Sequence, residues 1–96
     1  SNVVDVKIKL QNTSKEEVEK FIAYLKAHPR ITELFSVAGE WDISLVLISK
    51  DAIDLGEITQ EIRYKFGRLI SSWSESITVR CHKFEDFNMK KLIDER

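Results

Sequence analysis

Hydrophobic and polar residues alternate along four stretches of the chain in the pattern of half-buried β-strands. The first stretch, 4–10, has an aliphatic residue at every second position and charged residues between them. Two more, 31–38 and 41–48, are separated only by Gly39-Glu40, and a two-residue spacing of this kind predicts an antiparallel hairpin. The last stretch, 77–84, predicts a fourth strand.

Two other stretches repeat hydrophobic residues with the period of an α-helix. In the first, a glutamate follows both Thr13 and Ser14 by three residues, so either residue can begin the helix with a capping box. This helix is predicted to end near His28-Pro29. The second helix is predicted to begin at Asp54, with Glu57 three residues later. The two hydrophobic stripes consist of Val18, Phe21, Ile22 and Leu25, and of Leu55, Ile58, Ile62, Phe66 and Leu69.

The order of these elements is strand, helix, strand, strand, helix, strand, which predicts an α+β, ferredoxin-like βαββαβ fold. Right-handed crossovers would place both helices on one face of an antiparallel four-stranded sheet and leave the other face bare. The strands at 31–38 and 41–48 have hydrophobic residues on both faces, whereas a solvated face is mainly polar. We therefore expect a homodimer in which a second copy of the sheet covers the bare face.

Composition restricts the class of protein. A chain of 96 residues supports one hydrophobic core, and its hydrophobic and charged fractions, 43% and 32%, are those of a globular protein. Its hydrophobic runs are too short to cross a membrane. The net charge of -1, without a block of like charge, predicts weak binding to nucleic acid by this domain alone.

Cys81 is the only cysteine, so an internal disulfide is excluded and a reducing cytoplasm is expected. The chain begins Ser1-Asn2 without a methionine or a recognisable signal peptide, which indicates a protease scar or a fragment cut from a longer protein. Residues 85–96 contain several hydrophobic side chains. They form a C-terminal extension, for which we expect a short helix or an edge strand that reaches the partner subunit.

Four features together resemble the effector-binding domain of the Lrp/AsnC family of transcription regulators, often called the RAM domain. They are a polar Asn12-Thr13-Ser14 turn after the first strand, the segment HPRITELFSVAGEWDISLVL, a second helix ending in Phe66-Gly67, and a last strand SESITVRC. The family has a Gly-x-x-Asp motif between its two central strands, and this chain has Gly39-Glu40-Trp41-Asp42 there. The resemblance extends over about 3–84.

The resemblance implies a cytoplasmic, dimeric α+β barrel that assembles further to tetramers or octamers and lacks enzymatic activity. It also implies that an amino acid or related small metabolite binds where dimers meet, and that DNA is bound by a separate N-terminal helix-turn-helix domain. No cofactor and no metal are implied. The ligand-binding residues carried over to this chain are Gly39, Glu40, Trp41, Asp42, Ser74 and Ser76.

Each hairpin residue also has a structural interpretation. Gly39 can supply a positive φ at little steric cost, and Asp42 can accept hydrogen bonds from backbone amides instead of from a ligand's amino group. Trp41 and Trp73 can pack at an interface, where tryptophan is enriched. Trp73 occupies a position where the family often has small threonines.

The sequence gives little support for a catalytic site. Cys81 and His82 are neighbours in a predicted strand, so their side chains point to opposite faces and cannot form a nucleophile pair. The histidines, His28 and His82, lack the convergent ligands that a metal site needs. Two alternatives to the sensory domain remain, a small dimeric α+β barrel enzyme and a purely structural dimerisation domain.

Overall fold

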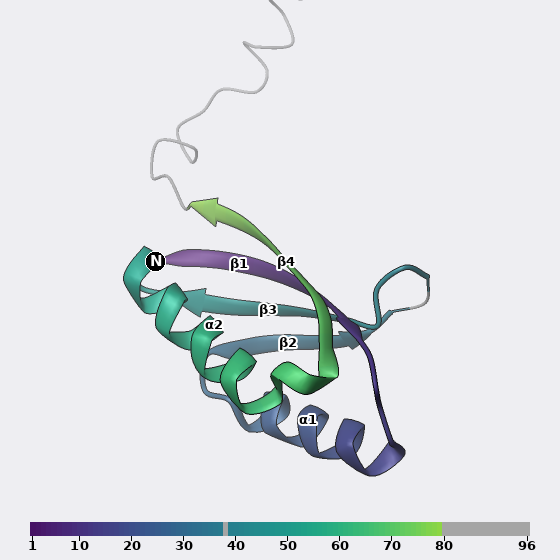
Figure 1. The fold of residues 1–96 in the computed structure, drawn as a ribbon. Coiled ribbons are helices and arrows are strands. Elements are labelled where there is room, and N and C mark those ends of the chain that lie inside the picture. Colours follow the sequence, from purple (N-terminus) through teal and green to yellow (C-terminus); the bar gives the residue numbers. More distant parts are fainter. Residues whose placement is uncertain (38, 80–96) are drawn as a thin grey trace, which may run out of the picture.

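A four-stranded antiparallel sheet carries two helices in the computed structural model, which describes residues 1–37 and 39–79. In chain order the elements are β1 (Asn2–Leu10), α1 (Lys15–Ala27), β2 (Ile31–Ser36), β3 (Ile43–Ser49), α2 (Ala52–Phe66), a short 3-10 helix η1 (Gly67–Leu69) and β4 (Ile70–Val79). The strand order across the sheet is β2-β3-β1-β4 (Figure 1). The predicted ferredoxin-like βαββαβ fold is confirmed.

Both helices pack against the same face of the sheet, and the core lies between the two layers (Figure 1). Phe21 and Leu25 of α1 are fully buried, and the ring centroid of Phe21 lies 4.7 Å from that of Phe66. The buried hydrophobic residues of the sheet are Val4, Val6, Ile8, Ile43, Leu45, Leu47 and Ile70. This helix-covered face therefore holds the single apolar core that the hydrophobic periods predicted.

Side chains fix where the helices begin. The hydroxyl of Ser14 accepts a hydrogen bond from the Glu17 amide at 3.1 Å, which confirms one of the two predicted starts of α1. The predicted start of α2 is wrong, because Asp51 and not Asp54 is the N-cap. The Asp51 carboxylate accepts from the Asp54 amide at 2.8 Å, and the Asp54 side chain is turned away to bind Arg30.

Two strand boundaries also differ from the prediction. β2 ends at Ser36 and β3 begins at Ile43, so the connection is longer than the expected two-residue turn. β4 begins at Ile70, well before the predicted 77–84, because the serine-rich residues 71–76 pair with β1. Pairing with a buried central strand overrides their low intrinsic strand propensity. The predicted strand beyond 79 and the extension at 85–96 lie outside the described residues.

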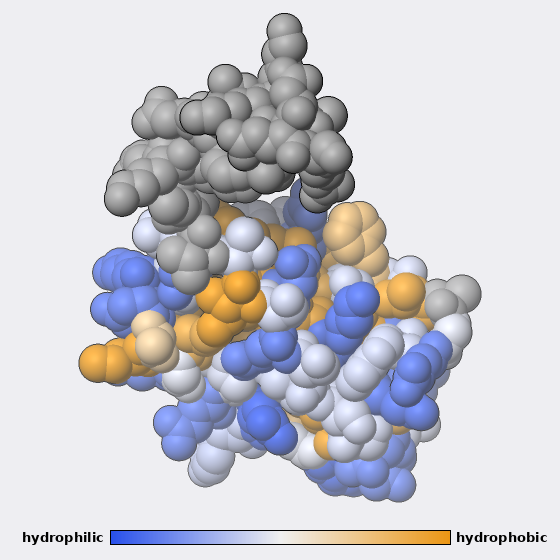
Figure 2. Space-filling model, turned by 90° about the horizontal axis from the view of Figure 1, so that it is seen from above, coloured by the Kyte–Doolittle hydropathy of each residue, from blue (hydrophilic) through white to orange (hydrophobic). Residues whose placement is uncertain are grey.

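The second face of the sheet carries no helix among the described residues, and we call it the open face. Phe35 is 54% exposed there and Ile48 is 37% exposed, while Val3 and Val46 are half-buried. Serines and charged residues lie between these hydrophobic groups. Figure 2, a view from above, shows orange and blue surface side by side on the side it presents.

Within residues 1–37 and 39–79, no helix is both long and apolar enough to cross a membrane.

Candidate functional site

The connection between β2 and β3 contains the predicted Gly-x-x-Asp motif. Gly39 has φ +115°, a region that side chains with a Cβ rarely adopt, so the predicted need for glycine is confirmed. Apart from the chain neighbours of Gly39, no atom in the described part of the chain lies within 4 Å of the position that a Cβ would occupy. The requirement for glycine at this position therefore comes from backbone conformation alone.

Asp42 ties this connection to the end of β1. Its amide donates to the carbonyl of Ile8 at 3.0 Å, and its carbonyl accepts from the Val37 amide at 3.1 Å. Its carboxylate Oδ2 accepts from the Leu10 amide at 2.8 Å. The structural interpretation of Asp42 thus has direct support, although the amide comes from a distant strand and not from the turn itself. In the described part of the chain, Oδ1 of Asp42 accepts no hydrogen bond, so the carboxylate keeps an oxygen available to a ligand.

A groove of about 470 Å³ lies beside Asp42, between α1 and the outer part of β2, and we call it the α1 groove. Its lining consists of Leu10, Val18, Ile22, Lys26, Leu34, Phe35, Ser36, Val37, Asp42 and Ile43. Most of this lining is hydrophobic. The charged residues of the lining are Asp42 and Lys26. An apolar groove with one charge of each sign has the chemical character of an amino-acid site.

The other predicted ligand-binding residues do not line the α1 groove. Glu40 is exposed and Trp41 is half-buried, both in the connection itself. Ser74 and Ser76 lie on the open face of β4, opposite Lys7 and Asp5 of β1. The β1 strand separates them from β3, so they are about two strand spacings, or roughly 10 Å, from the β3 side. Within one chain the structure brings together Asp42 and α1, and not Asp42 and the serines.

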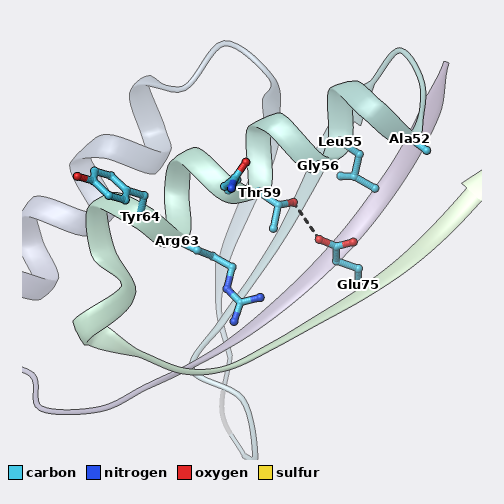
Figure 3. Close-up of a pocket in the computed structure, with 8 residues that line it drawn as sticks. Ala52, Leu55, Gly56, Thr59, Arg63, Tyr64 and Glu75 are labelled. Atoms are coloured by element: carbon cyan, nitrogen blue, oxygen red, sulfur yellow. Dashed lines mark hydrogen bonds between the residues drawn. The ribbon is translucent and has the colours of Figure 1, made fainter.

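A second groove, between α2 and β4, was not predicted from the sequence. It has a volume of about 570 Å³, and Figure 3 shows the side chains of Thr59 and Glu75 meeting across it. One oxygen of Glu75 accepts from Thr59 Oγ1 and from Trp73 Nε1, each at 2.9 Å. The guanidinium of Arg63 lies 5.9 Å from the Trp73 ring centroid. Glu75 occupies a helix-facing position opposite Val6, so correct placement of β4 would have revealed it as an acid in an otherwise apolar row.

A third cleft, near the start of β2, contains a structural ion pair. Arg30 binds both carboxylate oxygens of Asp54, at 2.9 and 3.2 Å, and also donates to the Ile48 carbonyl at 3.2 Å. The hydrogen bond from the Lys50 amide is the main cause that lowers the pKa of Asp54, and the charge of Arg30 lowers it further. Burial of this carboxylate, 17% exposed, opposes the shift. The partners that the described residues supply to this pair are all internal, and the pair holds α2 to the sheet.

Metal chemistry has no support within the described ranges, where no group of three histidine, cysteine or acidic side chains could hold an ion. His28 has a structural role, because its Nδ1 accepts from the Arg30 amide at 3.1 Å. His82 and Cys81 lie outside those ranges.

Comparison with known proteins places this geometry in a family. A family model described as the Lrp/AsnC ligand binding domain matches residues 3–69. An AsnC family transcriptional regulator from Agrobacterium tumefaciens superposes with a TM-score of 0.75 at 18% identity, covering 84% of this chain and 52% of that one. No curated protein matches the chain at a significant level.

Two more solved structures share the fold. A transcriptional regulator from Neisseria meningitidis, solved as a complex with L-Met, has a TM-score of 0.71 at 15% identity and covers 83% of this chain and 51% of its own. A protein from Pyrococcus horikoshii has a TM-score of 0.69 at 24% identity, with 85% and 94% covered. The chain thus spans about half the length of the first two regulators and nearly all of the third protein.

Proposed function

Because the chain belongs to the Lrp/AsnC ligand-binding domain family, we propose that it is the effector-sensing and oligomerisation domain of a cytoplasmic transcription regulator. Its effector is an amino acid or a related small metabolite, bound at a subunit interface. DNA is bound by a separate N-terminal domain. The chain matches only about half the length of two related regulators, which leaves room in them for such a domain. The domain itself catalyses no reaction.

The observation that carries this proposal is the α1 groove, with Asp42 and Lys26 in a largely hydrophobic lining. A free amino acid has an ammonium group, a carboxylate and a side chain of variable polarity. The open oxygen of Asp42 suits the ammonium group and Lys26 suits the carboxylate. The groove opens toward solvent, so a second subunit would complete its enclosure. Ligand affinity would then depend on the state of assembly, so that ligand binding could shift the balance between assemblies.

The open face supports the oligomerisation part of the proposal. Phe35, Ile48, Val3 and Val46 expose hydrophobic surface on a sheet face that helices do not cover. A second copy of the same face buries this surface for both subunits with one closed interface. The dimer packs its two sheets face to face, and tetramers or octamers then form from dimers.

A thermal-shift screen of the common amino acids tests the sensory part. At a ligand concentration about 100 times Kd, binding adds about 2.7 kcal/mol to the free energy of unfolding, enough to raise Tm by several degrees. We expect one amino acid or a small group of them to stabilise the wild-type domain. If none of them changes Tm, the sensory role fails and a purely structural dimerisation domain remains.

Asp42→Asn identifies the site. An asparagine oxygen still accepts from the Leu10 amide, so the connection stays in place, but the charge that binds an ammonium group is lost. We expect the ligand-induced shift to disappear while Tm without ligand changes little. Glu19→Gln is the control, because it removes an exposed carboxylate at a residue outside the groove lining and outside the predicted ligand-binding set. A shift that persists in Asp42→Asn would place the effector elsewhere.

A further inference from the structure

The central strand β1 places two opposite charges on the open face. Val4, Val6 and Ile8 are fully buried on the helix-covered face, so the residues between them, Asp5 and Lys7, must point the other way. Both are exposed. None of the four ion pairs formed within residues 1–37 and 39–79 involves either side chain.

The neighbours of these charges across the sheet are uncharged. Lys7 pairs with Ser44 of β3 and Ser74 of β4, and Asp5 pairs with Val46 and Ser76 in the same strands. The other charged residues on this face are Lys9, further along β1, and Glu33, beyond Val46 on β2. A partner sheet would remove water from Asp5 and Lys7, and buried charges are tolerated only when they are paired.

Two-fold symmetry limits how such a pairing can arise. When two identical sheets stack face to face, the symmetry axis lies in the plane between them. An axis running along β1 would stack each residue on its own copy, with Asp5 facing the partner's Asp5. An axis running across the strands at the level of Val6 makes the two β1 strands antiparallel and places Lys7 over the partner's Asp5, twice.

Neighbouring registers are unfavourable. Moving that axis by one residue toward the N-terminus stacks Asp5 on the partner's Asp5. Moving it the other way stacks Lys7 on the partner's Lys7, although Asp5 then faces the partner's Lys9. Like charges in direct opposition at an interface are strongly unfavourable, so complementary charges act mainly as selectors of register and partner. With the axis level with Val6, Asp5 and Lys7 each face a charge of opposite sign on the partner, and neither faces its own copy.

We propose that β1 stacks antiparallel on β1 of a second copy, about a two-fold axis level with Val6, and that Asp5 and Lys7 pair reciprocally to set this register. This inference rests on the face-to-face dimer of the proposed function and adds its geometry. It makes these two residues the determinants of self-recognition on the open face.

Charge exchange tests the proposal. Asp5→Lys gives two cations at these positions and Lys7→Asp gives two anions, so each variant should dimerise at least about tenfold more weakly than wild type, by analytical ultracentrifugation. Mixing the two variants should restore dimers, which native mass spectrometry should identify as heterodimers. The double variant Asp5→Lys/Lys7→Asp should restore the homodimer, because the pair is only reversed.

Control variants distinguish failure of the Asp5–Lys7 pair from failure of dimerisation itself. Glu19→Lys and Lys15→Asp make the same charge changes at exposed positions of α1 and should leave dimerisation unchanged. If wild type is a dimer and the single variants dimerise equally well without preferring each other, the charge pair is refuted and the dimer stands. A monomeric wild type would refute the dimer and this register with it. Asp5→Asn and Lys7→Gln provide a milder version of the test should a charge reversal unfold the chain.

Discussion

The two faces of the sheet are built from the same strands but differ in almost every physical respect. On β3, Leu45 is 0% exposed on the helix-covered face, while its neighbour Val46 is only half-buried on the open face. On β1, aliphatic residues face the helices and Asp5 and Lys7 face away. The helix-covered face contributes most of the folding free energy of one chain, whereas the open face leaves hydrophobic side chains exposed, and we propose that a second copy covers them.

Leu45→Ala should have the largest effect on stability. Leu45 is fully buried, so the substitution leaves a cavity in the core and should lower the free energy of unfolding by about 2–5 kcal/mol. Urea unfolding followed by circular dichroism measures the change. Val46→Ala is the matched control on the same strand, and below the dimer Kd it should cost less than about 1 kcal/mol. Equal losses for the two variants would contradict the difference between the faces.

Asp54→Asn should produce the next largest effect, and only over part of the pH range. The pKa of Asp54 is lowered in the fold, so its stabilising contribution is present above the unfolded pKa of about 3.8 and is lost as pH falls through the folded value. The variant should therefore be less stable than wild type at neutral pH. The difference should shrink on acidification below about pH 4.

Urea midpoints measured from neutral to acidic pH test this expectation. Asp51→Asn is the control, because it removes a carboxylate from the same end of α2 while an amide oxygen still accepts from the Asp54 amide. It should leave the midpoint at neutral pH nearly unchanged. A constant difference between wild type and Asp54→Asn at every pH would mean that ionisation of this carboxylate does not stabilise the fold.

The fold was predictable because its information is local and repeated. Hydrophobic periods identified both α-helices and three of the four strands, together with the end of β4, but not the short helix η1. The Ser14 cap was predicted from the glutamate three residues later. The start of β4 was not readable, because serines fill 71, 72, 74 and 76, and an acid, Glu75, interrupts the inward apolar row. Only pairing with β1, which is separated by most of the chain, makes this segment a strand.

The residues of the candidate site, like the fold, could be predicted from the sequence only in part. Turn chemistry marked Gly39 and Asp42, and the structure gives both the backbone roles that such residues serve. Lys26 was not identified, because it reaches the α1 groove from a helix with no sequence link to the connection. The grouping of Asp42 with Ser74 and Ser76 remains a prediction about an assembly, since one chain holds them on different sides of β1.

Glu75→Ala tests the acid that interrupts the helix-facing apolar row of β4, and its expected effect on stability is small. Glu75 is exposed, so water can satisfy Thr59 and Trp73 once the carboxylate is gone, and the loss should stay below about 1 kcal/mol. Trp73 fluorescence should shift toward that of a more solvated indole, measured in a Trp41→Phe background. Glu57→Ala, an exposed acid on α2, should leave the spectrum unchanged. A loss comparable with that of Leu45→Ala would mean that the α2–β4 groove belongs to the core.

Phe35→Ser should have the smallest effect on unfolding of the single chain and a large effect on assembly. The Phe35 ring is 54% exposed, so in the monomer little buried surface is lost, and stability should change by no more than about 0.5–1 kcal/mol. In the dimer the same ring would be buried against a second sheet, and its removal should weaken association at least about tenfold. Sedimentation at several concentrations gives the dimer Kd, while unfolding below that Kd gives monomer stability. Unchanged dimerisation would show that this edge of the open face is not covered, and would restrict the interface to β1 and its immediate neighbours.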